Sequence, residues 1–381
     1  MLHSIIIYGG LLCVLSNLAF YANHLNKQIS LNTKYSRLFV LLLILLIFSL
    51  ILGSRYDVGI DHLSYLSMYL DLSKGYDIQT TTIEPGWVLL NKLFINCGAH
   101  YSVFFSFLCA LQILFILLAF KDRINILPWV LFALMCGPFL SWLSLIRQYQ
   151  VICIFIWLSM TIEKRNFINY LFWIIICAFF FHKSALILLL IYPFIKCRKS
   201  FTGPIVLQII IFTICLYIGI TKFLLNKLEF MNTIAFIVGY GDSYGQVDDF
   251  ERFNRDTNFG IRSYLVTLLI YITIFLSNKL KYGIKDNTIK TFYNYYFYGY
   301  CLFMITFGLD AVGRFFHYFY GTAFVIYGYL LYYLYKNKRK SKLDLFKYIS
   351  VITLNLLTFI GLLYDVQIDE SHTMFRFYWQ L

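Results

Sequence analysis

The chain has 381 residues, of which 60% are hydrophobic and 13% charged, and its mean hydropathy is +0.71. A soluble domain carries about 25% charged residues, so this composition indicates lipid as the surrounding solvent. The formal net charge of +13 does not require nucleic acid as a partner, because membrane proteins concentrate Lys and Arg in their cytoplasmic loops.

Hydrophobic runs predict an all-α polytopic membrane protein with about twelve transmembrane helices. A helix of roughly 20 apolar residues crosses the hydrocarbon core, and helices are needed because lipid cannot satisfy an unpaired backbone. The N-terminus lacks a basic segment and a cleavage site, so its apolar run is interpreted as a span. The expected spans are residues 4–22, 37–54, 101–120, 127–141, 144–162, 167–182, 184–196, 203–221, 263–280, 291–309, 315–335 and 345–364.

A shorter apolar piece, residues 86–97, predicts one interfacial or re-entrant helix. Two longer outer loops are expected at about 55–85 and 221–262. No internal repeat or flexible linker is visible, and residues 1–381 are therefore expected to form a single transmembrane domain.

The loops separate into two classes by charge. Residues 23–37, 121–123, 163–165, 196–199, 279–290 and 336–347 hold 20 Lys and Arg against 4 acids, whereas the rest of the chain holds 12 against 15. Basic loops stay in the cytoplasm. With twelve spans, both termini are then predicted on the outer side.

The first outer loop carries three candidate residues. Arg55 stands where the second span ends, Asp61 precedes a helix-like run, and Glu84 comes directly before Pro85 and Gly86. A snorkelling Arg, a capping Asp and a helix-start Glu are the structural alternatives for them.

Two further candidates lie at the ends of spans on the same side. Arg147 falls a few residues inside an apolar segment, and an Arg there usually faces a cavity or a partner, although snorkelling remains an alternative. His182 interrupts a long apolar run in the sequence FHKSAL. A neutral imidazole can take a proton from a hydroxyl group, but a lone His is often structural.

Arg262 follows the second outer loop, and Arg314 stands four residues after Asp310 in another outer hairpin. Arg side chains bind phosphate through two parallel hydrogen bonds, while a carboxylate or imidazole supplies a base. We therefore predict an outer site in which Arg147, Arg262 and Arg314 bind phosphate and His182, Asp61 or Glu84 supplies a base, which suits a lipid-linked phosphate donor.

Four motifs in chain order resemble the EpsG family over roughly residues 1–335. Arg55, Gly59, Asp61 and Tyr65 are similar to its first outer loop, and Glu84 with Gly86 to its Glu-x-Gly step. The remaining two are Arg147 with Gln148, which resembles its Arg-Gln pair, and FHKSAL at residues 181–186. Ile60 departs from the family, which usually has Thr there.

The resemblance implies a Wzy-like polymerase in the bacterial inner membrane, acting on O-antigen, capsule or exopolysaccharide. Such an enzyme joins undecaprenyl-diphosphate-linked repeat units, so its partners are the glycan donor, the glycan acceptor, the lipid bilayer and a chain-length regulator protein. The resemblance then implies that the diphosphate is held by Arg147 and Arg314, with Arg262 and Arg55 as helpers. It also implies that the acceptor hydroxyl is oriented or deprotonated by His182, Asp61 or Glu84. No metal site and no Asp-x-Asp motif is visible in the outer loops, so we expect neither metal nor cofactor.

Three other functions remain open. An O-antigen ligase or another lipid-linked glycosyltransferase would share the span count and the outer polarity. A repeat-unit flippase would show an internal repeat and polar residues deep in several spans. A membrane-bound O-acyltransferase would use a His such as that of FHKSAL, which the predicted topology places on the outer side.

Overall fold

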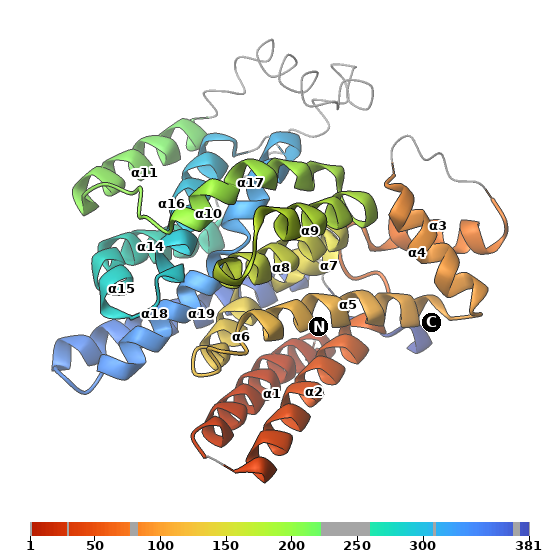
Figure 1. Cartoon of the computed structure of the whole chain (residues 1–381), viewed down its shortest axis with the longest axis horizontal. Helices are drawn as coiled ribbons and strands as arrows, with labels where there is room; N and C mark the ends of the chain where they lie inside the picture. The colour runs from red at the N-terminus through yellow and green to blue at the C-terminus, as the bar shows by residue number, and fades with distance from the viewer. Residues whose placement is uncertain are drawn as a thin grey trace. The chain divides into compact units, whose positions relative to one another are not determined.

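The computed structural model describes residues 2–28, 30–76, 83–221, 260–307, 310–368 and 374–380. Within these ranges every regular element longer than an isolated bridge is a helix (Figure 1). The predicted all-α class is therefore confirmed. Most of the second predicted outer loop, and residues 77–82 of the first, lie outside the described residues.

Four described helices are long and apolar enough to cross a membrane: α1 (Leu2–Asn26), α2 (Leu31–Gly53), α5 (Tyr101–Ala119) and α19 (Lys342–Ile368). A fifth span is possible if α14 (Ile261–Phe275) and α15 (Ser277–Gly283), bent by 55° at their junction, count as one. Shorter apolar helices are α6 (Leu127–Cys136), α8 (Ile146–Met160), α9 (Phe167–Phe180) and α11 (Ile205–Ile220). The number twelve stays a prediction.

Besides the bent pair α14 and α15, three more of the expected spans are interrupted. Residues 127–141 break at Gly137 and Pro138, after which α7 (Phe139–Ser144) begins. Residues 184–196 form a 3-10 helix, Lys183–Ile191, followed by α10 (Tyr192–Cys197). Residues 315–335 are divided between α17 (Asp310–Tyr320) and α18 (Ala323–Asn337). The first of these breaks is explained by Pro138, because the ring of a proline clashes with the preceding helical turn and its nitrogen donates no hydrogen bond.

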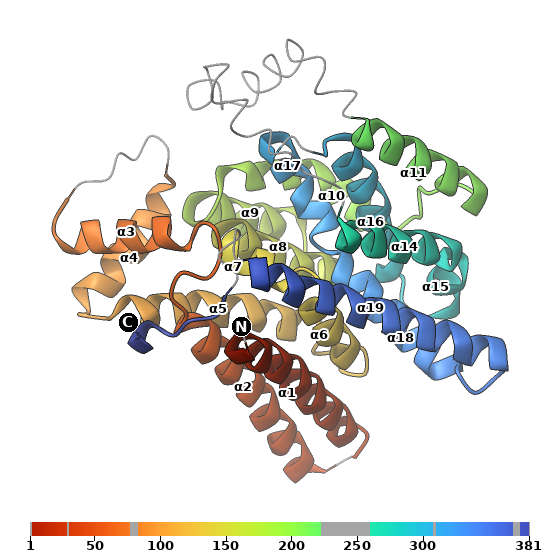
Figure 2. The ribbon, with the colours of Figure 1, turned by 180° about the vertical axis from the view of Figure 1, so that it is seen from behind.

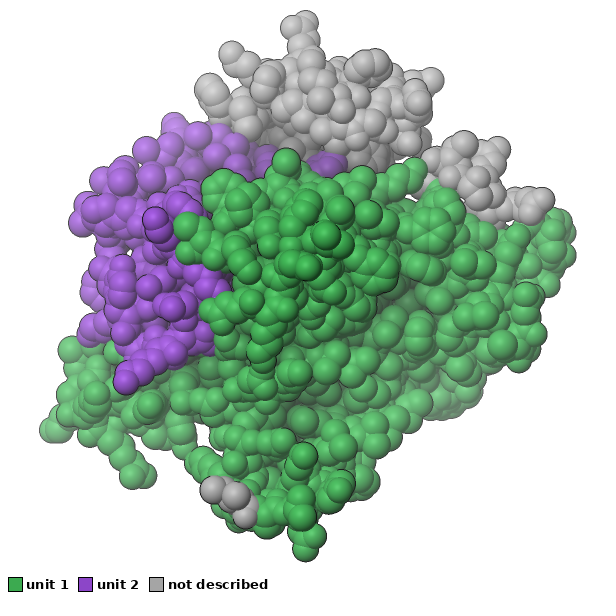
Figure 3. Space-filling model, viewed as in Figure 1, with its two compact units in different colours: residues 1–197, 327–381 green, residues 198–326 purple. Residues whose placement is uncertain are grey.

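The chain divides into two compact units, residues 1–197 with 327–381 and residues 198–326 (Figure 3). In the first unit α1 and α2 pair as a hairpin and α5 packs on α2 (Figure 1). A Cβ at Gly53 would lie 2.1 Å from the Ser106 Oγ, so these two backbones meet directly. In the second unit α16 (Thr288–Ile305) packs on α11 and α17.

In the first unit, α5 and α8 run parallel. Near one end the Gln150 Nε2 donates to the Leu108 carbonyl at 2.7 Å, and further along the Trp157 and Phe115 rings are 5.2 Å apart. The two helices therefore carry their first residues to one end of the bundle and their last residues to the other.

Residues 374–380, here called the C-terminal strap, bind to the first loop after α2. The Tyr56 N–H donates to the Arg376 carbonyl at 2.8 Å and the Tyr378 N–H to the Ser54 carbonyl at 3.0 Å. The Phe375 N–H donates to the Ser4 Oγ at 2.9 Å. The start of α1 and the strap thus lie together at one end of the α1–α2 hairpin, as Figure 2 shows. That both termini face the outer side stays a prediction.

Candidate functional site

Arg147 is the second residue of α8 and forms an ion pair with Glu84. The Arg147 side chain is 21% exposed and that of Glu84 only 5%. Moving two charges out of water is costly unless each meets its partner. The pairing therefore fixes the Arg147 guanidinium at the N-terminal end of α8, where the side chain remains partly exposed.

Glu84 joins three segments of the first unit. It stands at the N-cap position of α4 (Pro85–Asn96), where its extended backbone leads into Pro85. One carboxylate oxygen accepts from Arg147, and the other accepts from the Lys183 backbone N–H at 3.0 Å. Because both oxygens are engaged, Glu84 is suited to orienting Arg147 and the turn after α9 rather than to taking a proton.

Gly86 lets α4 approach α9 closely enough for these contacts. A Cβ at Gly86 would lie 2.7 Å from the Phe179 carbonyl oxygen and 2.6 Å from the Phe179 ring. No side chain fits between the two backbones. The Glu-x-Gly step of the sequence is therefore explained by a carboxylate that bridges segments and a glycine that allows the close approach.

Two aromatic rings accompany Arg147. Its guanidinium carbon is 5.7 Å from the centre of the Tyr65 ring and 5.9 Å from that of Trp87. Two buried donors, the Arg147 Nε and the Trp87 Nε1, have no hydrogen-bond partner in the described part of the chain. A buried donor without an acceptor is rare and often marks a place taken by water or ligand. An oxygen atom of a water or a ligand would supply the acceptor that each of these donors lacks.

His182 directly precedes Lys183, the residue whose backbone N–H donates to Glu84. It is half-buried and stands at the N-cap position of the 3-10 helix. Its Nδ1 is 2.7 Å from the Ser184 Oγ and 3.4 Å from the Ser184 backbone nitrogen, which donates to it. These contacts orient the imidazole from its Nδ1 edge.

Asp61 holds the N-cap position of α3 (His62–Ser73) without a capping hydrogen bond from its side chain. Its charge acts on Arg147. The structural alternative of a capping Asp is thus seen in its position but not in its hydrogen bond, and Asp61 supplements Glu84 as a negative charge near the cation.

Arg55 is fully buried. It donates to the carbonyls of Leu52, Val58 and Leu143 at 2.5, 3.1 and 3.4 Å. Gly59, whose φ is +99°, also packs there, because a Cβ at Gly59 would lie 2.6 Å from the Leu143 oxygen. Arg55 therefore fastens the loop to the end of α7, and its expected contact with a diphosphate would need this packing to open.

Arg262 and Arg314 belong to the second unit, on α14 and α17 respectively, and both are half-buried. Near Arg314 on α17, the His317 Nδ1 and the Tyr320 Oη are 2.9 Å apart. That Arg262 and Arg314 share one site with Arg147 stays a prediction. Among the described residues no three His, Cys, Asp or Glu side chains gather as metal ligands do, and metal independence likewise stays an expectation.

The structure thus brings Arg147, Glu84 and Asp61 together and places His182 next to the residue that Glu84 holds. Sequence reasoning did not assign Trp87 or Tyr65 to the site. Tyr65 is the last residue of the first-loop motif and Trp87 directly follows the Glu-x-Gly step. Their positions in these motifs are the feature of the sequence that could have indicated a place in the site.

One of the comparisons with known proteins gives a match. No curated protein and no solved structure matches the chain. The EpsG family matches residues 38–375, a range that contains all four motifs and both units' arginines. The chain therefore belongs to the EpsG family.

Proposed function

We propose that this protein is a polysaccharide polymerase that joins undecaprenyl-diphosphate-linked repeat units at the outer face of the bacterial cytoplasmic membrane. Membership of the EpsG family supports a polymerase-like membrane protein. The observation that carries the proposal furthest is the Arg147–Glu84 pair with its two unpartnered buried donors.

In the proposed reaction, a hydroxyl oxygen of the acceptor unit attacks the anomeric carbon of the growing chain. A glycosidic bond forms, the bond between that carbon and the diphosphate oxygen breaks, and the hydroxyl proton passes to a base. Undecaprenyl diphosphate leaves with the bonding electrons. A fixed cation near the leaving oxygens lowers the barrier because charge develops there in the transition state.

We assign the diphosphate to Arg147, because it retains partial exposure and an unpartnered buried Nε. Arg314 and Arg262 remain proposed helpers from the second unit. The base is assigned to His182, since both oxygens of Glu84 are already engaged. Asp61 and Glu84 then act by holding Arg147, and Tyr65 and Trp87 offer flat faces to a sugar ring.

The experiment is complementation of a polymerase-null strain followed by a ladder gel of its surface glycan. Arg147→Ala and His182→Ala, at normal protein levels, should leave single repeat units, and Arg147→Lys should give short ladders because Lys lacks the planar fork. Lys92→Ala removes an exposed cation of α4 and should restore the full ladder.

Full ladders from both Arg147→Ala and His182→Ala would overturn the site. The same gel distinguishes the rival functions. Loss of a ligase leaves lipid A-core unmodified, whereas loss of a polymerase leaves single repeats attached to it.

A further inference from the structure

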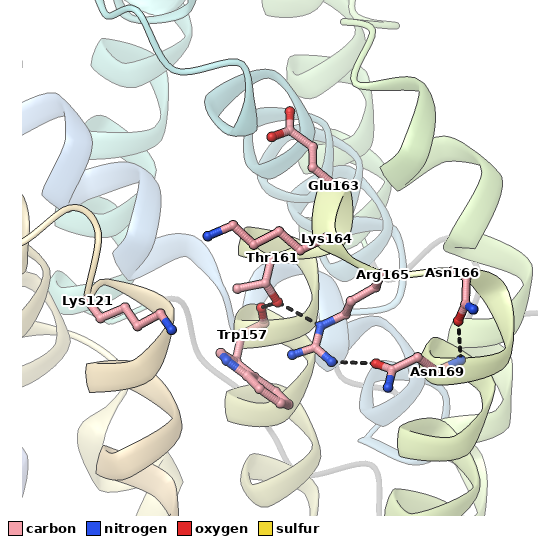
Figure 4. Close-up of a pocket in the computed structure, with 8 residues that line it drawn as sticks. All are labelled: Lys121, Trp157, Thr161, Glu163, Lys164, Arg165, Asn166 and Asn169. Carbon is pink, nitrogen blue, oxygen red and sulfur yellow. Dashed lines mark hydrogen bonds between the residues drawn. The ribbon is translucent and has the colours of Figure 1, made fainter.

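A second polar site lies in the first unit, at the opposite end of α8 from Arg147. It is a cavity of about 630 Å³, here called the inner-end pocket. Figure 4 shows its lining side chains, which include Lys121, Trp157, Thr161, Lys164, Arg165 and Asn169.

The pocket sits where three helix ends meet. α5 and α8 both end there, and α9 begins there. The Lys164 Nζ pairs with the Asp122 carboxylate at 3.3 Å, which joins the two loops after α5 and α8. Both loops belong to the basic class that the charge pattern places in the cytoplasm.

Arg165 is held rigidly in this pocket. Its guanidinium carbon is 3.9 Å from the centre of the Trp157 ring. Its Nε donates to the Thr161 Oγ1 at 2.8 Å, and its Nη1 donates to the Asn169 Oδ1 at 2.5 Å. The remaining guanidinium nitrogen has no acceptor in the described part of the chain, and Figure 4 shows it turned toward Lys121. A fork fixed in this way loses little entropy when it binds an oxyanion.

The charges around the pocket favour an anion. Lys121, Lys164 and Arg165 line it against one acid, Glu163, whose carboxylate points away from Arg165 in Figure 4. Because Lys164 already pairs with Asp122, the cations that favour an anion are Lys121 and Arg165. The N-terminus of α9 adds partial positive charge, with Asn166 capping it through the Asn169 N–H at 2.9 Å. Phosphate is the common anion that such a combination binds.

We propose that the inner-end pocket binds the phosphate of an anionic phospholipid from the cytoplasmic leaflet. A lipid is favoured over free phosphate because the first turns of α9 are apolar and open. Phe167, Ile168 and Phe172 are 46%, 73% and 56% exposed. This surface lies next to the pocket and fits acyl chains, while basic pockets between helices on this side fit headgroups.

The test uses the purified full chain in detergent, titrated separately with phosphatidylglycerol, phosphatidylcholine and inorganic phosphate, with bound lipid counted by native mass spectrometry. Phosphatidylglycerol should bind best and inorganic phosphate only weakly. Arg165→Gln and Lys121→Gln should each weaken phosphatidylglycerol binding about fivefold, which corresponds to roughly 1 kcal/mol per cation at a membrane surface.

The matched control is Lys340→Gln, which removes an exposed cation from another basic loop and should leave binding unchanged. Lys121 is exposed, so its variant remains informative if Arg165→Gln fails to fold. Unchanged affinity in Lys121→Gln, or equal loss in Lys340→Gln, overturns the pocket. Inorganic phosphate binding as tightly as phosphatidylglycerol overturns the lipid, and equal binding of phosphatidylcholine overturns the role of net charge.

Discussion

The ion pair between Glu84 and Arg147 fixes the candidate site at the residue scale. The two residues are 63 positions apart, and the pair joins α4 to α8. A buried pair stabilises little by itself, but loss of one partner leaves the other charge unpaired.

We therefore expect non-additive effects on stability. Arg147→Met keeps much of the side-chain volume and should destabilise the protein by about 3 kcal/mol, because Glu84 remains buried without its cation. The double variant Arg147→Met with Glu84→Gln should regain part of that loss. Thermal unfolding in detergent measures this, and a double variant that melts at the temperature expected from simple addition would contradict it.

His62 gives the first loop a predictable pH response. It is fully buried against Phe105, with ring centres 4.8 Å apart, and neither ring nitrogen has a partner among the described residues. Burial, reinforced by the charge of Arg55, lowers the pKa of His62 from 6.5 to about 2. Below pH 6.5 the imidazole of His62 therefore binds a proton in the unfolded chain but not in the folded chain. The free energy of unfolding consequently falls as the pH decreases from 6.5 toward 2.

The measurement is the apparent melting temperature of the wild type and of His62→Phe between pH 7.5 and pH 4. Phe fills the same space without titrating, so its melting temperature should fall less across this range. Parallel curves for the two proteins would show that His62 does not contribute.

At the level of elements, the contact between α4 and α9 depends on Gly86. Gly86→Ala should destabilise the protein by about 1–3 kcal/mol and shorten the glycan ladder, because its methyl group meets the Phe179 backbone. Gly10→Ala in α1 is the matched control, since nothing lies within 4 Å of its Cβ. Ala favours a helix over Gly by up to about 1 kcal/mol, so this control should melt at the same or a higher temperature.

The elements also show what hydropathy can and cannot predict. The helices α1, α2 and α5 lie where unbroken apolar runs predict spans, although α2 begins six residues before position 37 and α1 ends four residues after position 22. The division of residues 315–335 at Gly321 and Thr322 was not expected, because an average over a window does not register a local change of backbone direction.

The candidate site was predictable only in part for a similar reason. Charge patterning placed Arg147 and Glu84 on one side, but a contact across 63 residues is set by how helices pack. The surroundings of Arg55 were also not predictable from its place in the sequence. Its position at the end of a span suggested an exposed cation, whereas its guanidinium is buried against the Leu143 carbonyl, 88 residues away.

For the whole molecule, two native cysteines test the topology. Cys97 and Cys197 are both exposed; Cys97 lies in an outer loop of the predicted topology and Cys197 in a cytoplasmic one. In a variant that lacks the other seven cysteines, a membrane-impermeant maleimide applied to whole spheroplasts should label Cys97 only. Permeabilised cells should show both sites labelled. Labelling of Cys197 in intact spheroplasts would reverse or break the predicted order of spans.

The C-terminal strap has a consequence for biogenesis. Phe375 binds Ser4 across 371 positions, and Tyr378 binds Ser54. The first hairpin therefore leaves the ribosome and enters the membrane long before the segment that fastens it has been translated. During that interval the loop that holds Arg55 and His62 lacks its backbone partner. Final closure of this end must wait until the last residues have been translated, so a chain stalled late in synthesis should present an inserted but open hairpin to membrane proteases.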